Sequence, residues 1–267
     1  MTTPVAARPA PAPTSVFLAL LRRDVRVAAR ELGPFLVRTL MQPTLFLVVF
    51  GFLLPKMGFV RGNYTTALLP GILGVSLAMS SIQSVSFPMI QDFGWTREIE
   101  DRLLAPVPIS LIAMAKVASG TLQGVLAASV VLPIGRLIMG PIPGLTFTNI
   151  EVALGVVVLG AATFAALGLL IGTVINPQQI GLMFSIIVAP MMMFGCAYYP
   201  WRGLDAVPAM KWGVLVNPLV YVTEAMRGAV TPDVPHMPLA VTALALVVLT
   251  ALFSVLGVRS FTKRAMG

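Results

Sequence analysis

The longest run of uncharged residues in this chain lies between Glu151 and Arg202 and covers fifty positions. At about 1.5 Å per helical residue, such a run can cross a hydrocarbon layer roughly 30 Å thick twice. The sequence Asn-Pro-Gln-Gln at residues 176–179 interrupts the run with residues typical of a turn. The pattern therefore predicts two membrane-spanning helices, over residues 152–175 and 180–200.

Shorter uncharged windows, each closed by charged residues, predict four further spans. They lie at about residues 39–55, 66–91, 115–136 and 237–258. The pattern thus predicts an all-α polytopic membrane protein with six transmembrane helices in a domain over residues 34–259. The pair Gln42-Pro43 predicts a kink in the first helix, because proline removes one hydrogen bond of the helical ladder. The Pro/Ala-rich residues 1–14 are predicted to be a disordered tail, and residues 260–267 a cytoplasmic tail.

Composition supports this assignment and excludes several other classes of protein. Hydrophobic residues make up 57% of the chain and charged residues 10%, and the mean hydropathy is +0.92. The net charge of +8 does not indicate nucleic-acid binding, because the basic residues lie at span ends instead of in a stripe with aromatic residues. A single Cys196 and a single His236 leave no internal disulfide, no metal site and no catalytic residue to assign.

The distribution of basic residues predicts the orientation in the membrane. With the N-terminus inside, eleven Lys and Arg residues face the cytoplasm, six face outward and Arg38 is ambiguous. An excess of positive charge marks the cytoplasmic side, so both termini are predicted to be cytoplasmic. The cytoplasmic residues are Arg8, Arg22, Arg23, Arg26, Arg30, Arg97, Arg102, Lys116, Arg259, Lys263 and Arg264, and the outer ones are Lys56, Arg61, Arg136, Arg202, Lys211 and Arg227.

Residues 15–33 predict an amphipathic helix on the inner membrane surface. Apolar residues from Phe17 to Leu32 recur on one face, and four arginines between Arg22 and Arg30 gather on the other. This pattern is typical of a helix half-immersed in lipid headgroups. The helix is either a simple interfacial anchor or, in addition, a contact for a cytoplasmic partner.

The densest charge cluster follows the second span, over residues 92–108 (DFGWTREIEDRLLAPVP). A short charged helix with an apolar shoulder and a proline stop is typical of a segment that docks into a groove of another protein. The alternative is a solvated loop whose charges only fix topology. The candidate docking residues are Arg97, Glu98, Glu100, Asp101, Arg102, Leu103, Leu104 and Pro106.

A second polar segment lies on the predicted outer side, before the last span. Asn217 and Pro218 predict a helix start as N-cap and first helical residue, and Gly228 predicts its end. On this helix Tyr221, Glu224 and Arg227 follow each other at intervals of three and share a face. A Glu–Arg pair at the membrane edge is costly unless the two charges are paired. The pair is either functional or a structural ion pair that holds the outer loop.

These residues resemble a known family. The sequence from Asn217 to Arg227 (NPLVYVTEAMR) is similar to the C-terminal signature of the permease subunits of type-2 ABC exporters. The sequence from Arg102 to Ser110 with Lys116 is similar to the family's cytoplasmic segment between spans two and three, and Gln42-Pro43 to a feature of its first span. One departure is that Asp101-Arg102 stand where the family often has a Gly before Leu-Leu, which leaves the register of that segment open.

The resemblance implies a homodimeric or paired membrane domain of the bacterial cytoplasmic (inner) membrane, with short outer re-entrant helices. It also implies two separate ATPase subunits that bind ATP and Mg, and a coupling helix in the segment from Asp92. The chain itself has no Lys after a Gly, so it has no phosphate-binding loop of the G-x-x-x-x-G-K-[ST] type and is not expected to bind a cofactor.

Two other classes remain as alternatives. An ion-coupled carrier is disfavoured because none of the six windows contains Asp or Glu. The second alternative is an anchor or assembly subunit that does not itself transport a substrate. A membrane enzyme is disfavoured, since one His, one Cys and no intramembrane acid give no acid–base pair.

Candidate pathway residues for a substrate lie in the first and fifth spans. Methionine and phenylalanine side chains make a polarizable surface that suits varied amphiphilic drugs or lipids, although the same residues also serve as packing between helices. The tyrosines at the outer end are typical of an interfacial aromatic belt, and they also suit stacking on the sugars of a lipid-linked polysaccharide. The candidates are Gln42, Met191, Met192, Phe194, Tyr198 and Tyr199.

Overall fold

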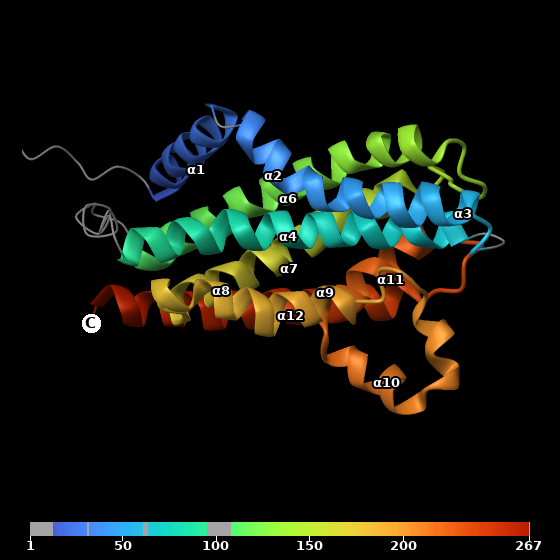
Figure 1. Ribbon diagram of the computed structural model, residues 1–267. Helices are drawn as coiled ribbons and strands as arrows, with labels where there is room; N and C mark the ends of the chain where they lie inside the picture. The colour runs from blue at the N-terminus through green and yellow to red at the C-terminus, as the bar shows by residue number, and fades with distance from the viewer. Residues whose placement is uncertain (1–12, 31, 61–63, 95–107, 267) are drawn as a thin grey trace, which may run out of the picture.

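The computed structural model describes residues 13–30, 32–60, 64–94 and 108–266, and all regular structure in these residues is helical. The helices form one elongated bundle (Figure 1). In chain order they are α1 (Pro13–Arg30), α2 (Leu32–Phe46), the π-helical η1 (Leu47–Leu53), α3 (Leu54–Lys56), α4 (Tyr64–Gly94), α6 (Ile109–Met139), α7 (Ile150–Val174), η2 (Pro177–Gln179), α8 (Ile180–Met183), η3 (Phe184–Val188), α9 (Ala189–Met193), η4 (Trp201–Ala206), α10 (Pro208–Gly213), η5 (Val214–Val216), α11 (Pro218–Val230) and α12 (Leu239–Met266).

Five helical segments of the described chain are long and apolar enough to cross a membrane. They are Thr39–Lys56, Tyr64–Phe93, Ile109–Met139, Ile150–Val174 and Leu239–Met266. The protein is therefore an all-helical, polytopic membrane protein. The segment predicted as the fifth of six spans is apolar but shorter, because its helical part covers only Pro177–Met193.

The structure differs from the predicted fifth span at the C-terminal end of that span. The helix ends at Met193, and not near residue 200, because the chain turns sharply where Cys196 has a φ of 52°. The carbonyl oxygen of Ala197 then lies so close to α4 that a Cβ on Gly71 would overlap it. Residues 194–200 are therefore folded against the bundle instead of extending the helix.

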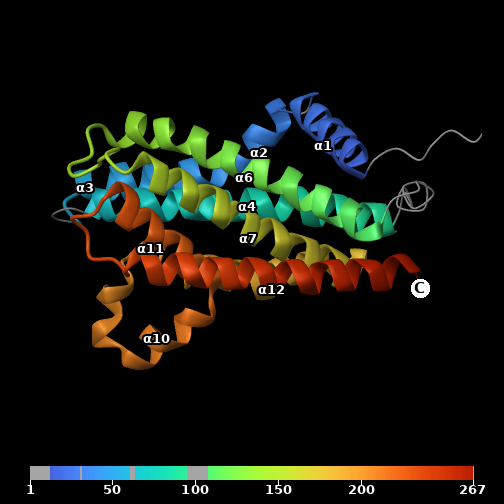
Figure 2. The same ribbon diagram turned by 180° about the vertical axis from the view of Figure 1, so that it is seen from behind.

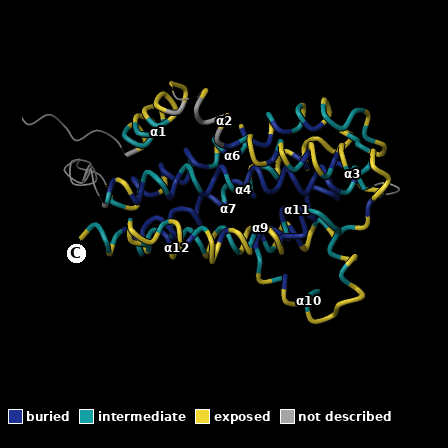
Figure 3. The backbone as a smooth tube through the Cα atoms, in the orientation of Figure 1, coloured by how far each residue is buried: buried dark blue, intermediate teal, exposed yellow. Residues whose placement is uncertain are grey.

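Helix α4 lies at the centre of the bundle. It packs along α6 and α7, and 83% of its apolar window is buried, against 11% for that of α12. Figure 3 shows the same contrast, with α4 mostly dark blue and α12 largely yellow and teal. The exposed apolar side chains of α12, such as Leu244 and Val248, are the kind that a helix presents to lipid.

Helix α1 lies beside the bundle at the end where α12 finishes (Figure 1 and Figure 2). Its four arginines, Arg22, Arg23, Arg26 and Arg30, are exposed. Its opposite side packs on α6, where the Asp24 carboxylate lies 3.6 Å from the Lys116 ammonium group. Lys116 is buried, so this ion pair fixes α1 to the first turns of α6.

Candidate functional site

Helix α11 is buried along almost its whole length, and the buried residues include the charged Glu224 and Arg227. It begins at Pro218, and the side chain of Asn217 caps it by accepting a hydrogen bond of 2.9 Å from the Leu219 backbone N–H. The Nδ2 atom of Asn217 donates to the carbonyl of Met191 at 2.7 Å. The predicted cap is therefore present, and it also joins α11 to the end of α9.

Glu224 and Arg227 form an ion pair in the interior, one turn apart on α11. The Arg227 Nη1 atom donates to Glu224 Oε1 at 2.7 Å, and neither side chain is exposed to any extent. The same Oε1 accepts the backbone N–H of Trp201 at 2.9 Å, and Oε2 accepts that of Met237 at 2.9 Å. The carboxylate therefore holds the chain before α12 and the start of η4 against α11.

The guanidinium of Arg227 makes three further contacts with backbone carbonyl groups. Its Nε atom donates to Ala67 in α4 at 3.2 Å, and Nη2 donates to Ala197 at 3.2 Å and to Cys196. The Thr223 hydroxyl adds a bond of 2.9 Å to the carbonyl of Gly195. One ion pair thus connects α11 with α4, with the turn after α9, with η4 and with the entry to α12. We call this set of contacts the outer polar lock.

The lock satisfies the charges that it buries. A buried ion pair is favourable only when further hydrogen bonds replace the lost water, and both oxygens of Glu224 and three nitrogens of Arg227 have partners here. Removing one partner would leave an uncompensated buried charge, which costs about 3–5 kcal/mol. The arrangement supplies rigidity, and it offers no unoccupied acid or base for chemistry.

Two details of α11 differ from expectation. Tyr221 shares the predicted helix face, but its hydroxyl donates to the carbonyl of Leu215 at 2.7 Å and not to the ion pair. The predicted end at Gly228 is wrong, because α11 continues to Val230. Gly228 lies instead where a Cβ would meet the imidazole of His236, so its role is close packing.

The six candidate pathway residues do not form one cluster. Met192 is buried in the main core, whereas Gln42 and Phe194 are exposed. The ring of Tyr198 lies 5.2 Å from that of Phe46 and 5.7 Å from that of Phe50, measured between centroids. Tyr198 therefore joins the first span to the turn after α9. Met191 and Phe194 line an apolar groove between α9, α10 and α12, and Tyr199 packs in a small outer core beside Trp201.

The candidate docking residues from Arg97 to Pro106 lie outside the described residues. Helix α4 leads into this segment at Gly94, and α6 leaves it at Ile109. Near the end of α4 the Arg264 side chain of α12 donates to the carbonyls of Thr173 at 2.7 Å and Ile175 at 3.1 Å. Its guanidinium also lies 4.8 Å from the ring centroid of Phe93 in α4. Arg264 thus caps the C-terminus of α7 and holds the last turn of α4.

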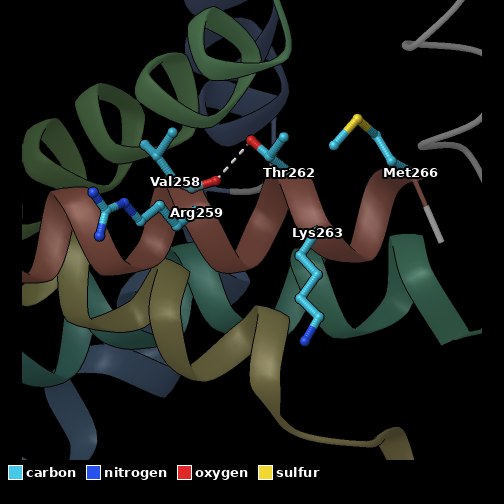
Figure 4. A pocket seen from close by; sticks show the side chains of 5 residues that line it. All are labelled: Val258, Arg259, Thr262, Lys263 and Met266. Carbon is cyan, nitrogen blue, oxygen red and sulfur yellow. Dashed lines mark hydrogen bonds between the residues drawn. The ribbon is translucent and has the colours of Figure 1, made fainter.

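Sequence reasoning placed Arg264 only among the charges that set topology. Its partners are carbonyl groups about ninety residues earlier in the chain, so no local sequence pattern predicts these contacts. The other basic residues of this end have a different environment. Arg259 and Lys263 are exposed, and with Val258, Thr262 and Met266 they border a shallow hollow of about 450 Å³ along α12 (Figure 4). All five residues come from one helix, so no second element closes the hollow around a ligand.

In the part of the chain that the structure describes, no three His, Cys, Asp or Glu side chains lie together in a way that would hold a metal ion.

The sequence of residues 15–231 matches the family described as ABC-2 type transporter. The chain belongs to this family. It is also similar to the inner membrane transport permease YadH of Escherichia coli (strain K12) and to the proteins of the same name from Escherichia coli O157:H7 and Shigella flexneri. Each is 28% identical over 212 residues, which are 74% of this chain and 79% of the relative.

Membership of the ABC-2 family indicates the general role of this helical bundle. The chain is the membrane subunit of an ABC exporter and a multi-pass protein of the inner membrane. Permease subunits of ABC-2 transporters are generally non-catalytic, and they associate with ABC ATPase partners. The predicted resemblance to type-2 ABC exporters is therefore confirmed.

Proposed function

We propose that this ABC-2 subunit crosses the membrane six times and forms, with a second copy, the export pathway for an amphiphilic drug or lipid-like substrate. Two separate ATPase subunits bind ATP and Mg and supply the energy. The apolar segment Pro177–Met193 is the fifth crossing in this proposal. Both termini are cytoplasmic, which agrees with α1 and the end of α12 lying at one end of the bundle.

The distribution of carboxylates carries this proposal. Among the described membrane helices, the only carboxylates are Asp92 and Glu151, and each lies within the last or first turn of its helix. The buried Glu224 already accepts three hydrogen bonds. Ion-coupled carriers place titratable carboxylates near the membrane centre, so this arrangement favours energy from a partner ATPase over an ion gradient.

The coupling segment of the proposal runs from Asp92 to Pro106. Its ends join α4, which is the most buried span, to α6, which holds α1 through Lys116. A movement of the segment would therefore reach the centre of the bundle directly. Glu98, Glu100 and Asp101 meet basic groups of the ATPase groove, and Leu103 and Leu104 face its apolar floor.

An amphiphilic substrate is favoured over a lipid-linked polysaccharide by the state of the outer tyrosines. Tyr198 already packs on Phe46 and Phe50, and Tyr199 packs in the small core beside Trp201. These rings are therefore less open for stacking on sugars than an aromatic belt suggests. The apolar surface of Met191 and Phe194 stays accessible.

Co-reconstitution tests the proposal. The chain is purified with its soluble ATPase, placed in vesicles, and assayed for ATP hydrolysis and export with panels of drugs, lipids and glycolipids. We expect drugs or lipids to stimulate hydrolysis, and export to persist when an ionophore collapses ion gradients. Export that depends on the gradient would indicate a carrier, and co-purification without any flux would indicate an anchor subunit.

A further inference from the structure

The fifth apolar segment contains one helical turn that is wider than its neighbours. This turn is η3, between α8 and α9 (Figure 1), and its last hydrogen bond runs from the Ala189 N–H to the carbonyl five residues earlier. A π-helical turn within an α-helix carries one residue more than the α-helical turn that it replaces. The buried residues show the same insertion, because Met183 and Val188 are five positions apart, whereas Val188 and Met192 are four apart.

Both ends of this segment are attached to other parts of the bundle. At its C-terminal end the carbonyl of Met191 accepts the hydrogen bond of 2.7 Å from Asn217. Just before its N-terminal end, Arg264 holds the last carbonyls of α7. Between these attachments Ile186 is 64% exposed and Ile187 is 45% exposed. A segment held at both ends cannot swing outward, but an inserted residue can move along it, because only the residues between its old and new positions have to rotate.

The hydrogen bond at Met191 determines in which direction the inserted residue can move. A move toward Met193 would rotate the Met191 carbonyl away from Asn217. A move toward Ile180 leaves that bond intact. It rotates the residues that it passes by about 100°, the angle of one residue in an α-helix, so that each takes the place of the residue before it.

This move would exchange two apolar side chains in the core. Phe184 would take the buried place of Met183, and Met183 would take the place of Leu182, which is 59% exposed. Cores tolerate an exchange between apolar side chains of similar volume. The ring of Phe184 now lies 5.2 Å from that of Phe87 in α4, measured between centroids. The two positions of the inserted residue therefore differ in how the segment contacts α4.

The π-helical η1 of the first span lacks this freedom. Its residue Gly51 is buried, and a Cβ at this position would overlap the side chain of Met139. Moving the inserted residue of η1 by one position would bring Phe50 or Phe52 to the place of Gly51. The packing of α6 therefore fixes the register of η1. No such contact fixes η3, whose five residues include no glycine.

We propose that η3 is a register switch, in which the inserted residue moves between η3 and α8 and exchanges Met183 for Phe184 in the core. Both ends of the segment stay in place. Phe87 lies about two helical turns before Gly94, where α4 ends, so the switch gives α4 a means to act on the fifth segment. That role rests on the coupling segment of the proposed function, whereas the switch itself does not.

Relaxation-dispersion NMR of isotope-labelled methionine methyl groups tests the switch in the purified full-length subunit, without any ATPase. This measurement detects exchange between environments on the microsecond-to-millisecond timescale, and slower exchange gives two signals. Met→Leu substitutions assign the resonances. Met183 reports on the switch. Met192 lies in the same segment beyond the moving residues, and Met139 packs on η1, so both are internal controls.

Deletion of Ile187 removes the inserted residue and leaves Met183, Val188 and Met192 at the spacing of a continuous α-helix. The matched control is deletion of Val248, which is 56% exposed in the regular helix α12. The control deletion rotates Arg264 away from the end of α7. We expect a wild-type yield of folded subunit without Ile187, and a yield several-fold lower without Val248.

We expect exchange at Met183 in the wild type, a single environment for Met192 and Met139, and loss of the exchange when Ile187 is deleted. A single environment for Met183 in the wild type would overturn the switch. Exchange at Met192 as well, or exchange that persists without Ile187, would also overturn it, because the motion would not be that of an inserted residue. An equal loss of yield in both deletions would show that η3 holds no such residue. Because ATP hydrolysis and export are not measured, these outcomes are distinct from a failure of the proposed function.

Discussion

The Oε1 atom of Glu224 lies 2.7 Å from Nη1 of Arg227, and both side chains are fully buried one turn apart on α11. Four other segments attach to this pair through their backbone groups. The end of the bundle that contains α11 therefore depends on two charges that must both be present. This relationship gives the first prediction.

Glu224→Ala or Arg227→Ala should each destabilise the subunit by about 3–5 kcal/mol, because each leaves one buried charge uncompensated. The effect is measured as the loss of folded subunit on heating in detergent, with size-exclusion chromatography as the readout. The matched control is Asp205→Ala, which removes the more exposed Lys211–Asp205 pair and should cost less than about 1 kcal/mol. Wild-type stability and export in both α11 variants would make the outer polar lock irrelevant to folding and function.

Arg264 gives a second prediction at the opposite end. Arg264→Gln removes a charged cap from α7 and the contact with Phe93, which together should cost about 1–2 kcal/mol. We expect partner ATPase to bind normally while its stimulation by substrate falls. Lys263→Ala is the control, since Lys263 is the exposed neighbouring cation. Normal stimulation in Arg264→Gln would show that this cap has no part in coupling.

The Asp24–Lys116 pair predicts how α1 is held on the bundle. Asp24→Lys places two cations together and should release α1, so trypsin should cleave at the exposed Arg22, Arg23, Arg26 and Arg30 several-fold faster. The double variant Asp24→Lys with Lys116→Asp should restore slow cleavage. Equal cleavage in the wild type and the single variant would mean that contacts other than this ion pair hold α1.

Topology gives a fourth prediction. A reporter fused after Gly267 should be active only in the cytoplasmic format, and one inserted at Asp205 only in the external format. Together they show whether the two ends of the chain around α12 lie on opposite sides of the membrane. A cytoplasmic signal at Asp205 would remove the fifth crossing and with it the outward orientation of α10.

The sequence pattern predicted the long spans and the start of α11 because local chemistry decides both. A long uncharged and apolar window is stable as a helix only in a hydrocarbon layer. Asn217 accepts a hydrogen bond from one of the first N–H groups of a helix, and Pro218 needs no such bond, wherever that helix lies. The outer end of the fifth span was not predictable in the same way. Residues 194–200 carry no charge, so no local signal ends the span before them. They are folded back by contacts with distant parts of the chain, namely the close approach to Gly71 and the hydrogen bonds from Thr223 and Arg227.

The partners of the buried charges were beyond sequence reasoning for a related reason. The spacing of Glu224 and Arg227 in the sequence indicates that they can pair. Their backbone partners could not be predicted, because every residue has a carbonyl group and nothing in the sequence marks those of Ala67, Cys196 and Ala197. Arg264 and Asp24 likewise meet groups brought close only by the packing of distant helices. The pattern identified which charges are unusual, and the fold determined what satisfies them.

The central claim is that a partner ATPase drives this subunit through the segment from Asp92 to Pro106. The direct measurement is ATPase pull-down and substrate-stimulated hydrolysis with the triple variant Glu98→Lys, Glu100→Lys, Asp101→Lys. The control is Glu151→Lys with Asp233→Lys, two exposed acidic residues outside that segment.

We expect the triple variant to insert and dimerise normally but to lose both ATPase binding and stimulation, because charges across such a contact determine its register and association rate. The control should keep both activities. Wild-type yield of ATPase with the triple variant, together with intact export, would contradict the account and place the docking surface elsewhere.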